Sequence, residues 1–91
     1  MSSTSAPIVK SADMEQEQQT EALEIASTLY AELKSKQSEL ASALKGKLDE
    51  TFGGPWHVVV GKSFSSSVSH EKNGFIYFYI ENLAFLCFRT A

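Results

Sequence analysis

The sequence has few of the residues that mark a secreted, membrane or nucleic-acid-binding protein. Cys87 is its one cysteine, so no disulfide can form within the chain, and a reducing compartment is the default. The formal net charge is −3 and there is no block of lysine or arginine, which argues against nucleic acid or a membrane as partner. No apolar run approaches membrane-spanning length, and the polar residues 1–6 are not expected to be a secretory signal.

Motifs of catalysis and metal binding are missing as well. The chain has no Cys-x-x-Cys, no His-Glu-x-x-His, no glycine-rich phosphate loop and no Gly-x-Ser-x-Gly. We therefore expect no enzymatic activity, no catalytic residue and no cofactor. The competing hypothesis is a small hydrolase, or a metal protein that zinc content after dialysis would reveal. The side chains considered for such a site are His57, His70, Cys87, Glu71 and Asp49.

The remaining composition is typical of a small folded protein, with 43% hydrophobic and 21% charged residues. We interpret residues 7–91 as a single domain and residues 1–6 as a flexible tail. A monomer of 91 residues buries roughly 60–65% of the surface of its unfolded chain. Its core is therefore modest, and oligomerisation would add to its stability.

The first half of the chain favours a short strand followed by an amphipathic helix. Residues 7–10 are expected to form an edge strand, because a proline at its start removes no needed N–H group. Asp13 is expected to cap the helix, with Gln16 completing a capping box. The apolar positions that then recur at helical spacing are Ala22, Ala26, Leu29, Tyr30 and Leu33.

A second helix is expected after a polar break at residues 34–37, with Ser35 or Ser38 as its cap. Gly46 within this helix is expected to mark a close approach of two backbones. Gly53-Gly54-Pro55 ends it, because glycine adopts the left-handed conformation and proline cannot continue a helix. Its apolar stripe consists of Leu40, Leu44, Leu48 and Phe52.

The second half of the chain indicates strands. Residues 56–60 form one that ends at Gly61, and residues 75–80 and 83–88 form a hairpin around Glu81-Asn82. Asn73-Gly74 is a strong turn signal before that hairpin. With a further strand at residues 63–70, the order is β-α-α-β-β-β-β. This order predicts an α+β fold with two helices packed on an antiparallel sheet.

The strand expected at residues 63–70 is the most informative segment. It alternates like a strand but carries mostly small hydroxyl side chains, whereas residues 75–80 are apolar on both faces. A polar strand beside a doubly apolar one indicates a sheet edge, whose backbone N–H and C=O groups can pair with another chain. We therefore interpret the protein first as a peptide-binding or self-pairing module.

Particular blocks stand out once the elements are placed in this order. They are Val9-Lys10-Ser11-Ala12-Asp13-Met14, Pro55-Trp56-His57-Val58-Val59-Val60-Gly61, Phe64, Val68-Ser69-His70-Glu71 and Phe75-Ile76-Tyr77-Phe78-Tyr79. At this spacing they resemble the dynein light chain family of the small dimeric hub type. The resemblance runs from about Pro7 to Ala91.

The resemblance implies a non-catalytic, strand-exchanged homodimer, in which the serine-rich strand crosses over to the partner's sheet. Partner peptides then add as a further strand in two parallel grooves at the dimer interface. Implied partners are dynein intermediate or heavy chains and other short linear motifs, in the cytoplasm and the microtubule cytoskeleton. The alternative is a dedicated subunit of one axonemal dynein, either by itself or as a heterodimer with a paralogue. A pull-down would separate the two, since a hub captures many unrelated partners.

The resemblance also implies which residues bind. Lys10 matches a lysine at the groove rim, and the start of the second helix near Lys36 matches the site that holds a glutamine of the target, since a helix start offers unpaired N–H groups. The resemblance places three residues in the implied dimer interface, namely His57, Ser67 and Val68. The implied peptide-binding residues are Lys10, Gln37, Ser38, Ser63, Phe64, Ser65, Ser66, Ser67, Val68, Ser69, His70, Phe75, Tyr77 and Tyr79.

The chain departs from the family pattern at three places. Ser65 stands where the family has glycine, and Ser67 stands where it has an interface tyrosine. The loop between the helices is one residue longer and lacks the usual acidic-basic pair. Backbone pairing would survive these changes, whereas the choice of target and the strength of the dimer are open.

His57 has two interpretations. It is either a strand histidine with a local hydrogen bond or, as the resemblance implies, a residue that faces its symmetry mate across the dimer axis. Two buried imidazoles facing each other stay neutral, so the second interpretation predicts dissociation of the dimer in mildly acidic buffer.

Overall fold

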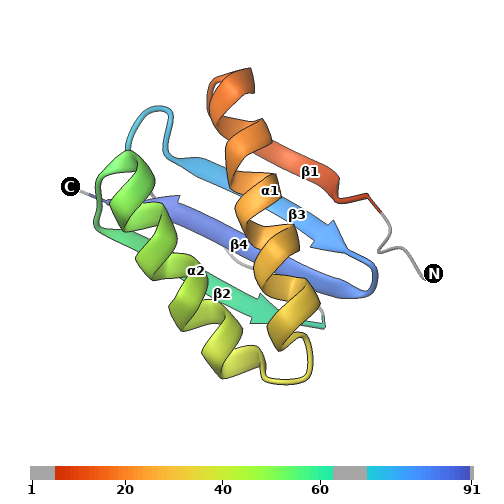
Figure 1. Cartoon of the computed structure of the whole chain (residues 1–91). Coiled ribbons are helices and arrows are strands. Elements are labelled where there is room, and N and C mark those ends of the chain that lie inside the picture. The colour runs from red at the N-terminus through yellow and green to blue at the C-terminus, as the bar shows by residue number, and fades with distance from the viewer. Residues whose placement is uncertain (1–5, 63–69, 91) are drawn as a thin grey trace.

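Two helices lie across one face of an antiparallel sheet in a computed structural model, which describes residues 6–62 and 70–90 (Figure 1). The described strands stand in the order β1-β3-β4-β2, so β1 and β2 form the two edges. The prediction of two helices on an antiparallel sheet is confirmed. The expected serine-rich strand at 63–70 lies almost wholly outside the described residues. The elements are β1 (Ile8–Asp13), α1 (Gln16–Leu33), α2 (Gln37–Phe52), β2 (Trp56–Gly61), β3 (Phe75–Ile80) and β4 (Leu83–Arg89).

Helix α1 packs through the stripe that its sequence indicates. Ala22, Ala26 and Tyr30 are buried, while the four glutamates of the helix are exposed. The Tyr30 hydroxyl donates a hydrogen bond of 2.8 Å to Glu81 Oε1 in the turn between β3 and β4. Burial, and then this carboxylate, raise the pKa of Tyr30. The helix is thereby fixed to the far end of the hairpin.

The predicted capping box of α1 is wrong. Asp13 belongs to β1, which continues three residues beyond Lys10 and pairs Asp13 with Phe75 of β3. The helix starts after Glu15, whose side chain makes no capping hydrogen bond. Pairing with β3 holds Asp13 in an extended conformation, so the helix begins only at Gln16.

Helix α2 also follows its predicted stripe, since Leu40, Leu44 and Leu48 are each at most 1% exposed. Neither Ser35 nor Ser38 caps it: the helix follows Lys36, and no side chain accepts a capping hydrogen bond. The expected close approach at Gly46 is wrong as well, because a Cβ built there would meet nothing within 4 Å.

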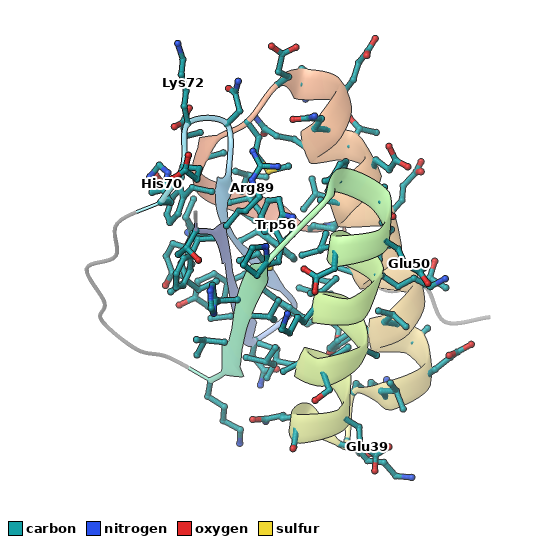
Figure 2. All side chains as sticks on the ribbon, turned by 90° about the vertical axis from the view of Figure 1, so that its left-hand side faces the viewer. Glu39, Glu50, Trp56, His70, Lys72 and Arg89 are labelled. Atoms are coloured by element: carbon teal, nitrogen blue, oxygen red, sulfur yellow. The ribbon has the colours of Figure 1, made fainter. Side chains whose placement is uncertain are left out.

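A seam joins the end of α2 to β2, and Figure 2 shows Trp56 between these two elements. Asp49 Oδ1 accepts the backbone N–H of Trp56 at 2.7 Å, and Asp49 Oδ2 accepts Lys45 Nζ at 2.8 Å. Trp56 is 1% exposed, and its indole N–H donates to Gly53 O at 3.0 Å. Gly53 has the positive φ of 81° expected of glycine at a helix end, and a cis peptide joins Gly54 to Pro55.

The β3–β4 hairpin forms the middle of the sheet, as predicted. Its register pairs Ile80 with Leu83, so the turn is at Glu81-Asn82, and Glu81 has a φ of 56°. The Asn73-Gly74 turn also forms, with Asn73 at a φ of 63° and Gly74 N–H donating to Glu71 O at 2.9 Å.

Neither helix is long and apolar enough to cross a membrane.

Candidate functional site

Strand β3 has two different faces. Ile76, Phe78 and Ile80 are at most 1% exposed and pack under the helices. The residues between them, half-buried and facing away from the helices, are Phe75, Tyr77 and Tyr79. These three were predicted as the floor of a peptide groove. The structure brings them into one row on one side of the sheet.

The two tyrosines of this row interact with each other and with β1. Their rings meet edge to face with centroids 5.9 Å apart, and the Tyr77 hydroxyl donates to the Tyr79 hydroxyl at 3.5 Å. This hydrogen bond, followed by burial, raises the pKa of Tyr77. Lys10 Nζ lies 5.6 Å from the Tyr79 ring centroid, a cation–π contact. Lys10, predicted at the groove rim, thus borders the row.

His70 closes the other end of the row. Its ring stacks on Phe75 with centroids 4.8 Å apart, and its Nδ1 lies 3.0 Å from Glu71 O. The same nitrogen lies 3.8 Å from Asp13 Oδ2, an ion pair only when the imidazole is protonated. Figure 2 shows His70 on the side of the sheet away from the helices. The predicted groove residue His70 therefore joins the aromatic row, and Asp13 joins it unpredicted.

Strands β4 and β2 extend this surface. The register places Leu86 between Tyr77 and Val59, and Phe88 between Phe75 and His57. Val59 is 44% exposed although it is aliphatic and central in its strand. We call this surface the helix-free face. It consists of Phe75, Tyr77, Tyr79, Ala84, Leu86, Phe88, His57 and Val59.

His57 makes the local hydrogen bond of its simpler interpretation. Its Nε2 lies 3.0 Å from Thr90 Oγ1, and its ring stacks on Phe88 at a centroid distance of 5.1 Å. His57 is exposed in the single chain and lies on the helix-free face. This position leaves it available to a second molecule.

The start of α2 holds the two predicted residues of the helix layer. Gln37 and Ser38 are both exposed there. The first backbone N–H groups of a helix lack partners within it, so they can donate to an acceptor on a ligand. Gln37 and Ser38 thus lie in the helix layer and not in the aromatic row.

The remaining predicted site residues lie outside the described part of the chain. The flanking residues are described: Gly61 ends β2, Lys62 follows it, and His70 precedes the Asn73-Gly74 turn. Those outside are Ser63, Phe64, Ser65, Ser66, Ser67, Val68 and Ser69.

The metal or hydrolytic site does not form from the described residues. Cys87 is 1% exposed within the core under the helices, where burial raises the pKa of its thiol. His57 and His70 belong to the opposite face of the sheet. Within residues 6–62 and 70–90, no three His, Cys, Asp or Glu side chains gather where they could hold a metal ion.

Sequence reasoning missed Val59, Leu86 and Phe88 as residues of the helix-free face. Residues 83–88 are apolar at odd and even positions alike, so their pattern does not tell the two faces apart. The turn at Glu81-Asn82 holds the missing information. Counting outward from it pairs Leu86 with Tyr77 and Phe88 with Phe75.

Comparison with known proteins gives one consistent result. A family model described as dynein light chain type 1 matches residues 6–90. Cytoplasmic dynein light chain 1 of Kluyveromyces lactis is 46% identical over 87 residues, covering 96% of this chain and 99% of that protein. Its counterpart in Debaryomyces hansenii is 44% identical over 84 residues, covering 92% of this chain and 91% of that protein. Among solved structures, the dynein light chain-like domain of a Fasciola hepatica calcium binding protein has a TM-score of 0.82 at 25% identity, covering 93% and 91% of the two chains.

Proposed function

Because this chain belongs to the dynein light chain type 1 family, we propose that it is a non-catalytic, dimeric light chain that holds extended segments of partner proteins. Its partners are the intermediate or heavy chains of a dynein and other proteins with short linear motifs. The relatives named cytoplasmic dynein light chain 1 support the cytoplasm and its cytoskeleton as the place of action.

The helix-free face is the observation that carries this proposal. Two helices cover one side of the sheet, and no described segment covers the other (Figure 1). That side presents aromatic and aliphatic side chains from three adjacent strands. A contiguous apolar surface of this kind on a small protein marks an interface. A chain of 91 residues also gains from a partner, because it buries little surface alone.

The dimer is proposed to form by exchange of residues 63–70, which follow the edge strand β2 in the sequence. Among the described strands β2 pairs with β4 alone, so its other edge can accept the partner's segment. Ser67 and Val68 would then lie in the interface, and His57 would face its counterpart near the axis. The stacking of His57 on Phe88 lies on the helix-free face, and this position supports the proposal.

Partner peptides are proposed to add along the exchanged strand by backbone hydrogen bonds, each contributing about 0.5–1.5 kcal/mol net. Phe75, Tyr77 and Tyr79 form the floor beneath the peptide, with Lys10 at the rim and His70 at the end of the row. Gln37 and Ser38 at the helix start would hold a glutamine of the motif. Two such grooves on one dimer raise avidity by as much as about 10²–10⁴ when both chains of a dimeric partner bind.

A mass measurement combined with a peptide titration tests this function. Sedimentation equilibrium should give twice the chain mass of 10.0 kDa. A peptide containing Thr-Gln-Thr should then bind with two equal sites per dimer and shift the amide resonances of β3. A monomeric mass together with no binding at a peptide concentration of ~1 mM would rule the proposal out.

The axonemal alternative has no comparable support. The relatives described above are named cytoplasmic, and no described residue favours a heterodimer over a homodimer. Co-purification with many unrelated partners would favour the hub, whereas a single motor complex would favour a dedicated subunit.

A further inference from the structure

Strand β1 is the second edge of the sheet, at the opposite end from β2. It pairs with β3 along one side, and all six of its residues are exposed. Ile8 is 58% exposed and Val9 is 38% exposed. The strand therefore presents a row of backbone donors and acceptors together with aliphatic side chains.

Helix α1 leaves this edge uncovered on the helix side of the sheet. Val9 stands opposite Phe78 in the ladder and thus shares its face. Phe78 is nevertheless only 1% exposed, whereas Val9 is 38% exposed. The helix passes over β3 and ends its cover before it reaches β1 (Figure 1). A concave corner results between the flank of the helix and the strand edge.

A hollow of about 500 Å³ lies along this flank of α1 and reaches Pro7, the residue just before β1. Leu23 supplies an aliphatic side chain to its lining. An added strand beside β1 would direct every second side chain toward the helix side of the sheet, where this hollow lies, since side chains alternate across a strand. We call it the β1–α1 corner. Its lining residues are Pro7, Thr20, Leu23, Glu24, Ser27 and Thr28.

The charge of α1 determines which partner fits. The helix carries Glu17, Glu21, Glu24 and Glu32 and no lysine or arginine. All four glutamates are exposed, and among the described residues none of them forms an ion pair. Glu24 lines the corner itself. A partner with a lysine or arginine at this point would meet an uncompensated carboxylate.

We propose that the β1 edge and the β1–α1 corner bind an extended segment of a partner protein by strand addition. The segment places an aliphatic side chain against Leu23 and, two residues along on the same face, a basic side chain beside Glu24. The ladder irregularity between Val9 and Ser11 keeps the paired stretch short. A second copy would bring another acidic helix against Glu24, so a second copy is not the occupant.

This site differs from the proposed groove in the surface that it uses, although strand β1 also carries Lys10 of the groove rim. It uses the outer edge of β1 with Leu23 and Glu24 on the helix side of the sheet, not the helix-free face. A light chain could then bind one segment in each place at the same time. Loss of one activity would leave the other intact.

The test uses the full chain, ¹⁵N-labelled, and the peptide acetyl-Thr-Val-Thr-Lys-Thr-Val-amide, which places valine and lysine on one face. Amide resonances of 8–13 and 23–28 should shift with a dissociation constant of ~1 mM or tighter. The same peptide with glutamate in place of lysine should bind at least about tenfold more weakly. No binding by the lysine peptide, or shifts confined to the helix-free face, would overturn the proposal.

Two charge reversals on α1 provide a matched pair. Glu24→Lys should weaken the binding of the lysine peptide by about tenfold. Glu32→Lys gives the same net charge but lies away from the corner, so it should weaken that binding less than about threefold. Equal losses would reveal non-specific attraction and contradict the site. Concentration-dependent shifts at residues 8–13 without peptide would assign the edge to a second copy, which also contradicts it.

Discussion

The two faces of the β3–β4 sheet are both apolar, and one is covered while the other is not. Under the helices, Ile76, Phe78 and Phe85 are at most 1% exposed, and the Phe78 and Phe85 rings stack with centroids 4.9 Å apart. On the helix-free face, Tyr77 and Tyr79 are half-exposed. The helices thus bury their side of β3 almost completely. On the helix-free face Ala84 and Leu86 of β4 are buried as well, but Tyr77, Tyr79 and Val59 keep part of their surface exposed.

The hydroxyl groups mark the difference in chemistry. The helix side of β3 has isoleucine and phenylalanine, whereas the helix-free side has two tyrosines that can keep a polar end in water. Such side chains suit a surface that is solvated in one state and buried in another.

The largest expected effect comes from a pair of truncations in β3. Phe78→Ala should lower the free energy of unfolding by about 3–5 kcal/mol, because it leaves a cavity in the core. Tyr79→Ala, on the other face, should cost less than about 2 kcal/mol, because water already reaches the ring. Urea denaturation at one low protein concentration measures both. Equal costs would mean that the two faces do not differ in the single chain.

A charge on the helix-free face should break the dimer and spare the fold. Val59→Lys would bury an unpaired ammonium group in the proposed interface and raise the dimer dissociation constant by about 30-fold or more. Thr51→Lys, an exposed position on α2, adds the same charge to the helix layer and serves as the control. Sedimentation velocity over a range of protein concentrations measures the dimer dissociation constant of both variants. If Val59→Lys sediments like the control, this face is not the dimer interface.

Loss of the Asp49 hydrogen bonds between α2 and β2 should lower the free energy of unfolding by an intermediate, pH-dependent amount. The hydrogen bond from Lys45, and then that from the Trp56 N–H, lower the pKa of Asp49 from its ordinary value of 3.8. A lowered folded-state pKa means that this stabilisation is present above the ordinary value and lost as pH falls through the lowered one. Asp49→Ala should cost about 1 kcal/mol at neutral pH, since the side chain is partly solvated.

Unfolding free energies of wild type and Asp49→Ala at neutral and acidic pH test this account. The difference between them should shrink as the pH falls toward and through the lowered pKa of Asp49. A constant difference across that range would show that the carboxylate's charge is irrelevant to the seam.

The smallest expected effect is an increase in stability. Gly46→Ala should stabilise the chain by about 0.5–1 kcal/mol, because alanine favours the helix and the added Cβ has open space. Gly53→Ala is the counterpart, and it should destabilise because Gly53 has a φ of 81°. Thermal unfolding of both variants measures the pair. A loss on Gly46→Ala would point to a neighbour that covers the outside of the helix layer.

The periodicity of apolar residues in the two helices predicted well which helix residues are buried, because each helix packs against the sheet along a single stripe. The spacing of Leu40, Leu44 and Leu48 located the stripe of α2, and the spacing of Ala22, Ala26 and Tyr30 located that of α1. The helix starts were predicted less well. Asp13 suits a cap, but pairing with Phe75, 62 positions along the chain, decides its conformation, and no local rule contains that contact.

The helix-free face needed more than a pattern. The run at 83–88 is apolar at every position, so only the hairpin register places Leu86 and Phe88 on the same side as the tyrosines. The predicted groove strand, with Ser65 and Ser67, stays a prediction. The aromatic row was predictable only through the resemblance, because alternation says which residues share a face but not what covers it.

Trp56 gives the molecule a selective optical probe. It is the single tryptophan of the chain, it is 1% exposed, and the Arg89 guanidinium lies 5.7 Å from its ring centroid. Its fluorescence therefore reports on the joint between α2 and the sheet. Ligands on either outer surface would leave that emission nearly unchanged, while the emission of Tyr77 and Tyr79 would respond. Tryptophan emission can thus follow unfolding, and tyrosine emission can follow ligand binding, in one unlabelled sample.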